Sequence, residues 1–130
     1  MPHKRVLRPD RLRHVPAQFS WIDQRFVRER HIERCSLAAL ALYLLLNVVA
    51  DAQGLSYYGD ATVCRCLSID QAALEHARAE LLALGLIAYQ RPLYQVLSFD
   101  PPPAPRAAGV RPAYKALAAL RSRLEQNKAP

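Results

Sequence analysis

The sequence predicts a mainly α-helical domain that ends in a small β-hairpin, an α+β fold. Apolar residues recur at helical spacing in two short runs, residues 60–67 and 71–84, with a three-residue break between them. A longer run at residues 37–52 is apolar almost all the way round, which is typical of a central helix covered on several sides. Residues 86–89 and 93–99 then have the composition of two strands around a short turn.

The first short helix is expected to begin at Asp60. Val63, Cys64 and Leu67 fall three to four residues apart, as the buried side of a short helix requires. Asp60 stands ahead of them as a predicted N-cap, whose carboxylate would accept a hydrogen bond from a backbone N–H of the first turn. The spacing therefore predicts a helix of fewer than three turns.

The second short helix is expected to begin after Asp70, which can cap it in the same way. Its apolar stripe is predicted to consist of Leu74, Ala77, Leu81 and Leu84. Gly85 should end it, because glycine readily adopts the left-handed conformation that follows a last helical turn. Two short helices joined by such a turn form the arrangement that places a second helix in a DNA major groove.

The strands are expected to form a three-stranded sheet. Arg91 would lie at the tip of the hairpin, and Tyr94 and Val96 would share one face of its second strand. Residues 55–58 would add a third strand. Gly54, just ahead of them, would end the central helix.

The apolar positions of these elements form one pattern: Val63-Cys64-x-x-Leu67-x-Ile69, followed by Leu74, Ala77, Leu81 and Gly85-Leu86-Ile87. This pattern, over about residues 36–99, resembles the winged helix-turn-helix family of bacterial DNA-binding proteins. The resemblance implies a double-stranded DNA partner and a hairpin that acts as the wing. Where many members carry Thr or Ser and Arg near the start of the second helix, this chain has Ala73 and His76.

Charge is distributed unevenly along the chain. Residues 1–34 carry a net charge of +5, residues 35–100 carry −3 and residues 101–130 carry +5, within a total of +7. The ends are therefore basic and the middle is acidic. A basic balance of this kind indicates a nucleic acid or another anionic surface as partner.

Residues 1–18 are predicted to form a basic arm, flexible in the free protein, because three prolines interrupt any regular period. One interpretation is a solvated tail with no specific role. The other is an arm that follows the DNA backbone or enters a minor groove. Its candidate DNA-binding residues are Arg5, Arg8, Arg11 and Arg13.

Two further segments flank the helix pair and its hairpin. Residues 19–34 are expected to form an extra N-terminal element of the domain at 19–99, with Ser20 and Asp23 resembling a capping box. Residues 100–109 are predicted to be a proline-rich linker, and residues 110–130 a basic amphipathic helix. The apolar stripe of that helix, which could dock on the domain or form a homodimer, is Tyr114, Leu117, Leu120 and Leu124.

The outward face of the second short helix offers few side chains for reading bases. Gln71 could pair with adenine, Glu75 could accept from cytosine, and Arg78 could contact guanine or phosphate. Glu75 and Glu80 would repel phosphates. We therefore expect modest sequence readout, with most of the affinity supplied by the arm and by Arg91.

Two alternative functions fit the same residues. An acidic face of small residues suits a protein-interaction module, for example in a replication or mobile-element complex. The Cys64-x-Cys66 pair suggests a thiol- or metal-sensing repressor, but residues two apart on a helix point about 160° from each other, which disfavours a shared ligand. Cys64 is expected in the core and Cys66 as a partly exposed thiol.

The remaining expectations are negative. The chain shows no phosphate-binding glycine loop and no nucleophile elbow, so we expect no enzyme, no cofactor and no metal. Its longest apolar run, ten residues at 37–46, is too short to span a membrane. Three cysteines without a signal-peptide pattern favour a reducing cytoplasm. The sequence thus predicts a cytoplasmic DNA-binding protein, acting as a transcriptional regulator or an accessory factor.

Overall fold

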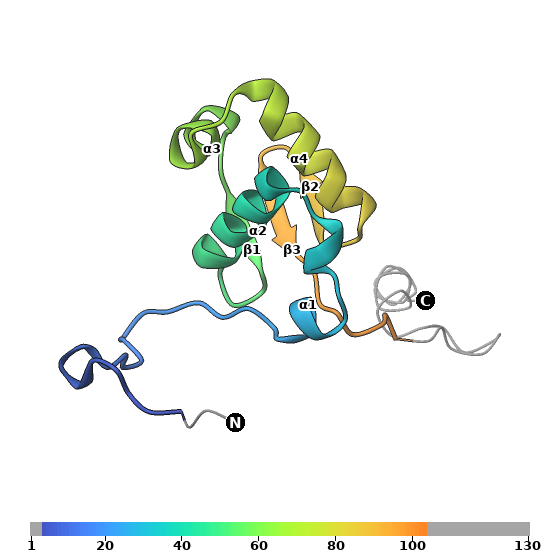
Figure 1. The fold of residues 1–130 in the computed structure, drawn as a ribbon. Helices are drawn as coiled ribbons and strands as arrows, with labels where there is room; N and C mark the ends of the chain where they lie inside the picture. The colour runs from blue at the N-terminus through green and yellow to red at the C-terminus, as the bar shows by residue number, and fades with distance from the viewer. Residues whose placement is uncertain (1–3, 104–130) are drawn as a thin grey trace, which may run out of the picture. The chain divides into compact units, whose positions relative to one another are not determined.

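The computed structural model describes residues 4–103 (Figure 1). Residues 1–99 form one unit of the chain, and a second unit begins at Asp100. Residues 104–109 of the predicted linker and the whole predicted helix at 110–130 lie outside the described residues.

The described residues form a mixed α+β fold, as the sequence predicts. The elements in chain order are η1 (Pro9–Arg11), α1 (Arg25–Arg28), η2 (Ile32–Arg34), α2 (Leu37–Val49), β1 (Leu55–Tyr57), α3 (Asp60–Leu67), α4 (Gln71–Ala83), β2 (Ile87–Gln90) and β3 (Leu93–Val96). Helices α2, α3 and α4 pack around a core that the sheet closes on one side (Figure 1). Within residues 4–103, no helix has the length and apolar character needed to cross a bilayer.

Helix α2 is the central helix. Ser36 caps it, and its Oγ accepts a hydrogen bond from the Ala39 N–H at 3.2 Å. The helix ends at Val49, three residues before the predicted end at Ala52. The cause is Asp51, whose Oδ1 accepts from the backbone N–H groups of Gln53 and Leu55 and so stabilises a turn that competes with the helix.

The predicted third strand is confirmed. The sheet is antiparallel in the order β1-β3-β2, with Ser56 and Tyr89 paired to either side of Tyr94. Tyr94 is fully buried and Gln95 is exposed, as the alternation of a strand requires. Strand β3 ends at Val96, short of the predicted Phe99, although the Leu97 N–H still donates to the Leu86 carbonyl.

The capping of the two short helices agrees with the sequence in part. Asp70 caps α4 as predicted, with its Oδ1 accepting from the Ala73 N–H at 2.8 Å, and Gly85 has the expected positive φ of 72°. The prediction that Asp60 caps α3 is wrong. Gly59 holds the N-cap position, and Asp60 is the first residue of the helix, with its carboxylate directed to residues of α4.

The extra N-terminal element at residues 19–34 packs on the domain through aromatic rings. Phe26 stacks on Tyr43 of α2 at 4.6 Å between ring centroids, and His31 stacks on Phe99 at the same distance. Only residues 25–28 and 32–34 of this element are helical.

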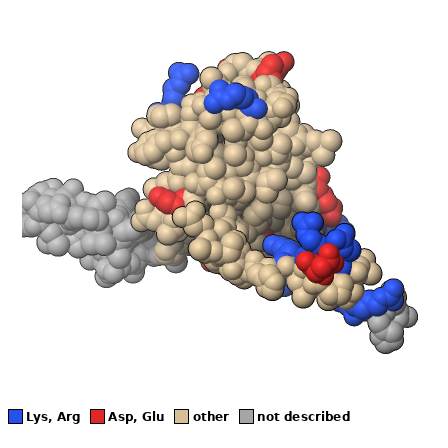
Figure 2. Space-filling view, turned by 90° about the vertical axis from the view of Figure 1, so that its left-hand side faces the viewer, with Lys and Arg blue, Asp and Glu red and all other residues tan. Residues whose placement is uncertain are grey.

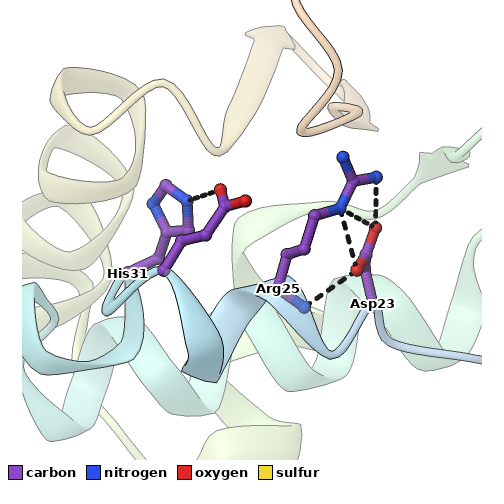
Figure 3. A network of polar contacts seen from close by, with 4 residues as sticks. Asp23, Arg25 and His31 are labelled. Carbon is purple, nitrogen blue, oxygen red and sulfur yellow. Dashed lines mark hydrogen bonds and ion pairs between the residues drawn. The ribbon is translucent and has the colours of Figure 1, made fainter.

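The predicted capping box of this element is absent from the described residues, because its two members have other partners. Ser20 Oγ donates to the Val48 carbonyl at 2.7 Å, far along the chain. Asp23 accepts from the backbone N–H and the guanidinium of Arg25 (Figure 3). Ser20 therefore fastens the segment to α2, and Asp23 organises the start of α1.

Candidate nucleic-acid interface

Helix α4 buries the predicted stripe and exposes its opposite face. Leu74, Ala77 and Leu81 are buried, and Leu84 packs against the same core. The exposed residues of α4 are Gln71, Ala72, Glu75, His76, Ala79, Leu82 and Ala83. This face has one carboxylate and no lysine or arginine, so it is a weak attractor of phosphate.

Arg78, the one arginine of α4, lies in an enclosed ion pair. Its Nη1 lies 2.9 Å from Asp60 Oδ1 and donates to Tyr94 Oη at 2.8 Å. The guanidinium also lies over the Tyr89 ring, 4.3 Å from its centroid. Only 12% of the Arg78 side chain and 14% of the Asp60 side chain are exposed. Arg78 therefore links α4 to the start of α3 and to both strands of the hairpin.

The pKa values of this group follow from the same contacts. The Arg78 guanidinium, and then the Gln71 amide, hold the pKa of Asp60 below its usual value. Burial lowers the pKa of Arg78, but its hydrogen bonds to Asp60 and Tyr94 outweigh burial and raise it. Burial raises the pKa of Tyr94 against the opposing effect of Arg78. The ion pair of Asp60 and Arg78 is therefore fully ionised at neutral pH.

The structure brings the three predicted base-reading residues of α4 together around Asp60. The Gln71 amide donates to Asp60 Oδ2 at 2.7 Å and to Glu75 Oε2 at 3.0 Å. We call Asp60, Gln71, Glu75 and Arg78 the Asp60 cluster. Gln71 and Glu75 are exposed and accessible to a ligand, whereas Arg78 would have to leave Asp60 and Tyr94 to reach a base.

Arg91 is exposed in the turn between β2 and β3, as predicted. The Tyr58 N–H donates to the Pro92 carbonyl at 3.2 Å, which places this turn beside the segment that enters α3. The charge of Arg91 is one of the smaller contributions that lower the pKa of Asp60. The hairpin tip and the Asp60 cluster therefore lie at the same end of the domain.

Glu80 does not add to the charge of the exposed α4 face. Its carboxylate accepts hydrogen bonds from the backbone N–H of Ser36 at 2.5 Å and from Ser36 Oγ at 2.8 Å. These bonds lower the pKa of Glu80 and direct it to the N-terminus of α2, where a negative charge is favoured. Of the two expected sources of phosphate repulsion, only Glu75 lies on the exposed face of α4, where its Oε2 accepts a hydrogen bond from Gln71.

The arm differs from the domain in being exposed at every described position. Residues 4–22 have no buried side chain, and the predicted arginines of the arm are all exposed. Arg8 forms a two-bond ion pair with Asp10, at 3.1 and 2.7 Å, with 67% and 64% of the two side chains exposed. Figure 2 shows basic side chains gathered near one end of the described chain, and a broad face without charge beside them.

Several residues of this region were not predicted from the sequence as part of a site. Tyr89 and Tyr94 contact Arg78, and Asp60, which the sequence predicts as a cap, pairs with Arg78 instead. Arg65, exposed on α3, is a further basic residue of the helix pair. No local pattern marks the pairing of Asp60 with Arg78, because the two lie 18 residues apart.

The cysteines are placed as predicted. Cys64 packs against the core, whereas Cys66 is exposed. Within residues 4–103, no group of three or more His, Cys, Asp or Glu side chains is positioned to hold a metal ion. No family model, curated protein or solved structure matches the chain.

Proposed function

We propose that this protein is a winged helix-turn-helix protein that binds double-stranded DNA, as a transcriptional regulator or an accessory factor. The observation that carries the proposal is the arrangement of α3, a short turn and α4 beside a hairpin, in a chain with an exposed basic arm. The expected partner is therefore a duplex, with α4 directed to a groove and the β2–β3 turn serving as the wing.

In this proposal the arm supplies most of the affinity. Helix α4 exposes one carboxylate and no guanidinium, so it cannot by itself offset the cost of approaching phosphates. The arginines that would neutralise phosphates are Arg5, Arg8, Arg11 and Arg13 of the arm and Arg91 of the hairpin turn. Phosphate contacts position a protein without reading sequence, so binding should be strong at low salt and only modestly selective.

Sequence choice would come from the exposed members of the Asp60 cluster. Gln71 and Glu75 can exchange their mutual hydrogen bond for contacts with base edges, such as adenine for Gln71 and cytosine for Glu75. We assign Arg78 mainly to positioning, because its guanidinium fixes α4 against α3 and the hairpin. Its influence on sequence choice would then act through the orientation of α4.

The test is binding to a random-sequence duplex over a salt series. The full chain is compared with a chain lacking residues 1–18 and with two variants of equal charge loss, Arg11→Gln/Arg13→Gln in the arm and Arg28→Gln/Arg34→Gln outside it. Each phosphate contact contributes roughly −0.9 to the slope of log affinity against log salt. We expect the slope to flatten by about 2 in the arm variant and to change little in the matched control.

Equal losses in the two double variants would show that net charge, and not the arm, governs binding. A full chain that fails to bind duplex at low salt would overturn the proposed function itself. The protein-interaction module would then become the better proposal. The exposed face of α4 favours it, because three of its seven exposed residues are alanines and the face has one carboxylate, Glu75, and no lysine or arginine to contact phosphate.

A further inference from the structure

Helix α2 has an apolar face that the described domain leaves uncovered. None of its 13 residues is charged. One side is buried against α4, α3 and β3. On the opposite side Leu37, Leu44 and Val48 are 84%, 54% and 56% exposed, and Ala41 completes the row.

These four residues form one continuous stripe. At 100° per residue they lie within about 60° of one another around the helix, and they extend over roughly 17 Å of its length. Leu37, Leu44 and Val48 are each more than half exposed, so no element of residues 4–103 covers them. Single exposed leucines are ordinary on a protein surface, but a contiguous uncharged row marks an interaction surface.

The segment that precedes α1 enlarges this surface at one end. The hydrogen bond from Ser20 Oγ to the Val48 carbonyl holds the segment beside the last turn of α2. Its neighbours in sequence, Phe19 and Trp21, are 65% and 73% exposed. The exposed apolar surface of α2 therefore runs from Leu37 to Val48, and the segment held at its end by Ser20 carries two exposed aromatic residues of the kind that are enriched at protein interfaces.

The order of the stripe residues indicates what covers it. Leu37, Ala41, Leu44 and Val48 are separated by four, three and four residues, so the stripe has the same spacing when the helix is reversed. Two copies of α2 packed antiparallel about a two-fold axis would place Leu37 opposite Val48 and the small Ala41 opposite the large Leu44. At the centre of the contact, Leu44 of each copy would then pack against Ala41 of the other, which lets the helices approach closely.

The lack of charge on the α2 stripe is compatible with the same contact. A protein with a net charge of +7 repels its own copies over most approaches. The α2 stripe brings no charge of its own into the contact, so two copies can meet there without burying an unpaired ion. An isologous dimer requires a surface that is complementary to itself, and the pairing of Ala41 with Leu44 across the two-fold axis provides that complementarity.

We propose that two copies of this protein associate through the outer faces of α2, packed antiparallel, with Phe19 and Trp21 of each copy at the edge of the contact. The pairing does not depend on DNA and differs from a dimer formed by the C-terminal segment. It would leave α4, the hairpin turn and the arm of each copy free, because none of these elements contributes to the stripe.

Sedimentation equilibrium on the full chain, over a concentration series without DNA, tests the proposal. The wild-type mass is expected to rise towards twice 14.6 kDa. Leu44→Glu would place two carboxylates near the dimer axis and should raise the dimer Kd by at least about 100-fold. The matched control is Leu82→Glu, an exposed leucine of α4 outside the stripe, which should leave the Kd within about threefold.

A wild-type chain that stays monomeric would overturn the proposal, as would a dimer that survives Leu44→Glu and so depends on another segment. Equal dissociation in both glutamate variants would show a general charge effect and would also overturn it. Circular dichroism reports whether each variant folds. Val48→Glu, at the C-terminal end of the stripe, provides a second substitution, which should raise the dimer Kd in the same direction and by a smaller factor.

Discussion

The arm and the Asp60 cluster use the same pair of residue types in opposite ways. Arg8 and Asp10 form an ion pair on the arm that is about two-thirds exposed, two residues apart in sequence. Arg78 and Asp60 form an ion pair of similar N–O distance that is almost enclosed, lies between residues 18 positions apart in sequence and joins α3 to α4. Water competes with the first pair and largely not with the second, so their contributions to folding and binding should differ.

This difference in exposure determines which arginines are available to a ligand. Arg8 can exchange Asp10 for a phosphate at little cost, because both groups stay hydrated throughout. Arg78 cannot leave Asp60 at a similarly low cost, since its departure would remove the ion-pair partner of Asp60 and the hydrogen bond to the Tyr94 hydroxyl. The position of a residue on α4 is therefore a poorer guide to a DNA contact than the exposure of its side chain is.

The largest expected effect is on folding. Arg78→Met keeps most of the apolar stem but removes the charge, and should lower the free energy of unfolding by about 2–3 kcal/mol because Asp60 is left partly buried and unpaired. Urea unfolding at neutral pH measures it. Arg65→Met on the exposed side of α3 is the matched control and Arg8→Met the arm counterpart, and neither should move the midpoint detectably. Equal shifts in all three would remove the distinction between the pairs.

A second expectation concerns pH. The pKa of Asp60 is lowered in the folded state, so its ion pair contributes stability above the unfolded carboxyl pKa of about 3.9 and loses it as the pH falls through the folded pKa. Wild type should exceed Asp60→Asn in stability by about 1–2 kcal/mol at pH 7. The gap should narrow below about pH 4. Denaturant unfolding of both chains across this range checks it.

A gap that stays constant down to acid pH would mean that the ionised carboxylate of Asp60 does not stabilise the fold. Asp10 and Asp23 also have lowered pKa values, caused by their hydrogen bonds to Arg8 and Arg25. Both residues are present in wild type and in Asp60→Asn, so their titration cancels in the comparison.

The smallest expected effect is on duplex affinity. Asp10→Asn removes the carboxylate that accompanies Arg8 and should raise affinity at low salt by about two- to fivefold, because the arm gains one net positive charge. Glu33→Gln makes the same charge change at an exposed ion pair outside the arm, with Arg30. Titration of duplex with the two variants distinguishes them, and an equal gain in both would indicate an effect of net charge alone.

Much of the fold could be predicted because the interactions that form it are local. Asp70 reaches a backbone N–H three residues on, and Gly85 adopts its left-handed conformation without help from distant residues. The alternation that buries Tyr94 follows from strand geometry alone. Where a prediction of this kind was wrong, as at Asp60 and Ser20, a partner distant in sequence had taken the local group.

The sequence alone is enough to predict the α+β order of elements, the Asp70 cap of α4, the basic character of the arm and the poor charge of the α4 face. The tertiary structure decided which side of the wholly apolar α2 is buried, and that Arg78 faces Asp60 and Tyr94 instead of solvent. The reason is the distance along the chain over which each interaction acts. Capping and periodicity act within a turn or two of the chain, whereas burial and long-range ion pairs exist only after α3, α4 and the sheet have been brought together.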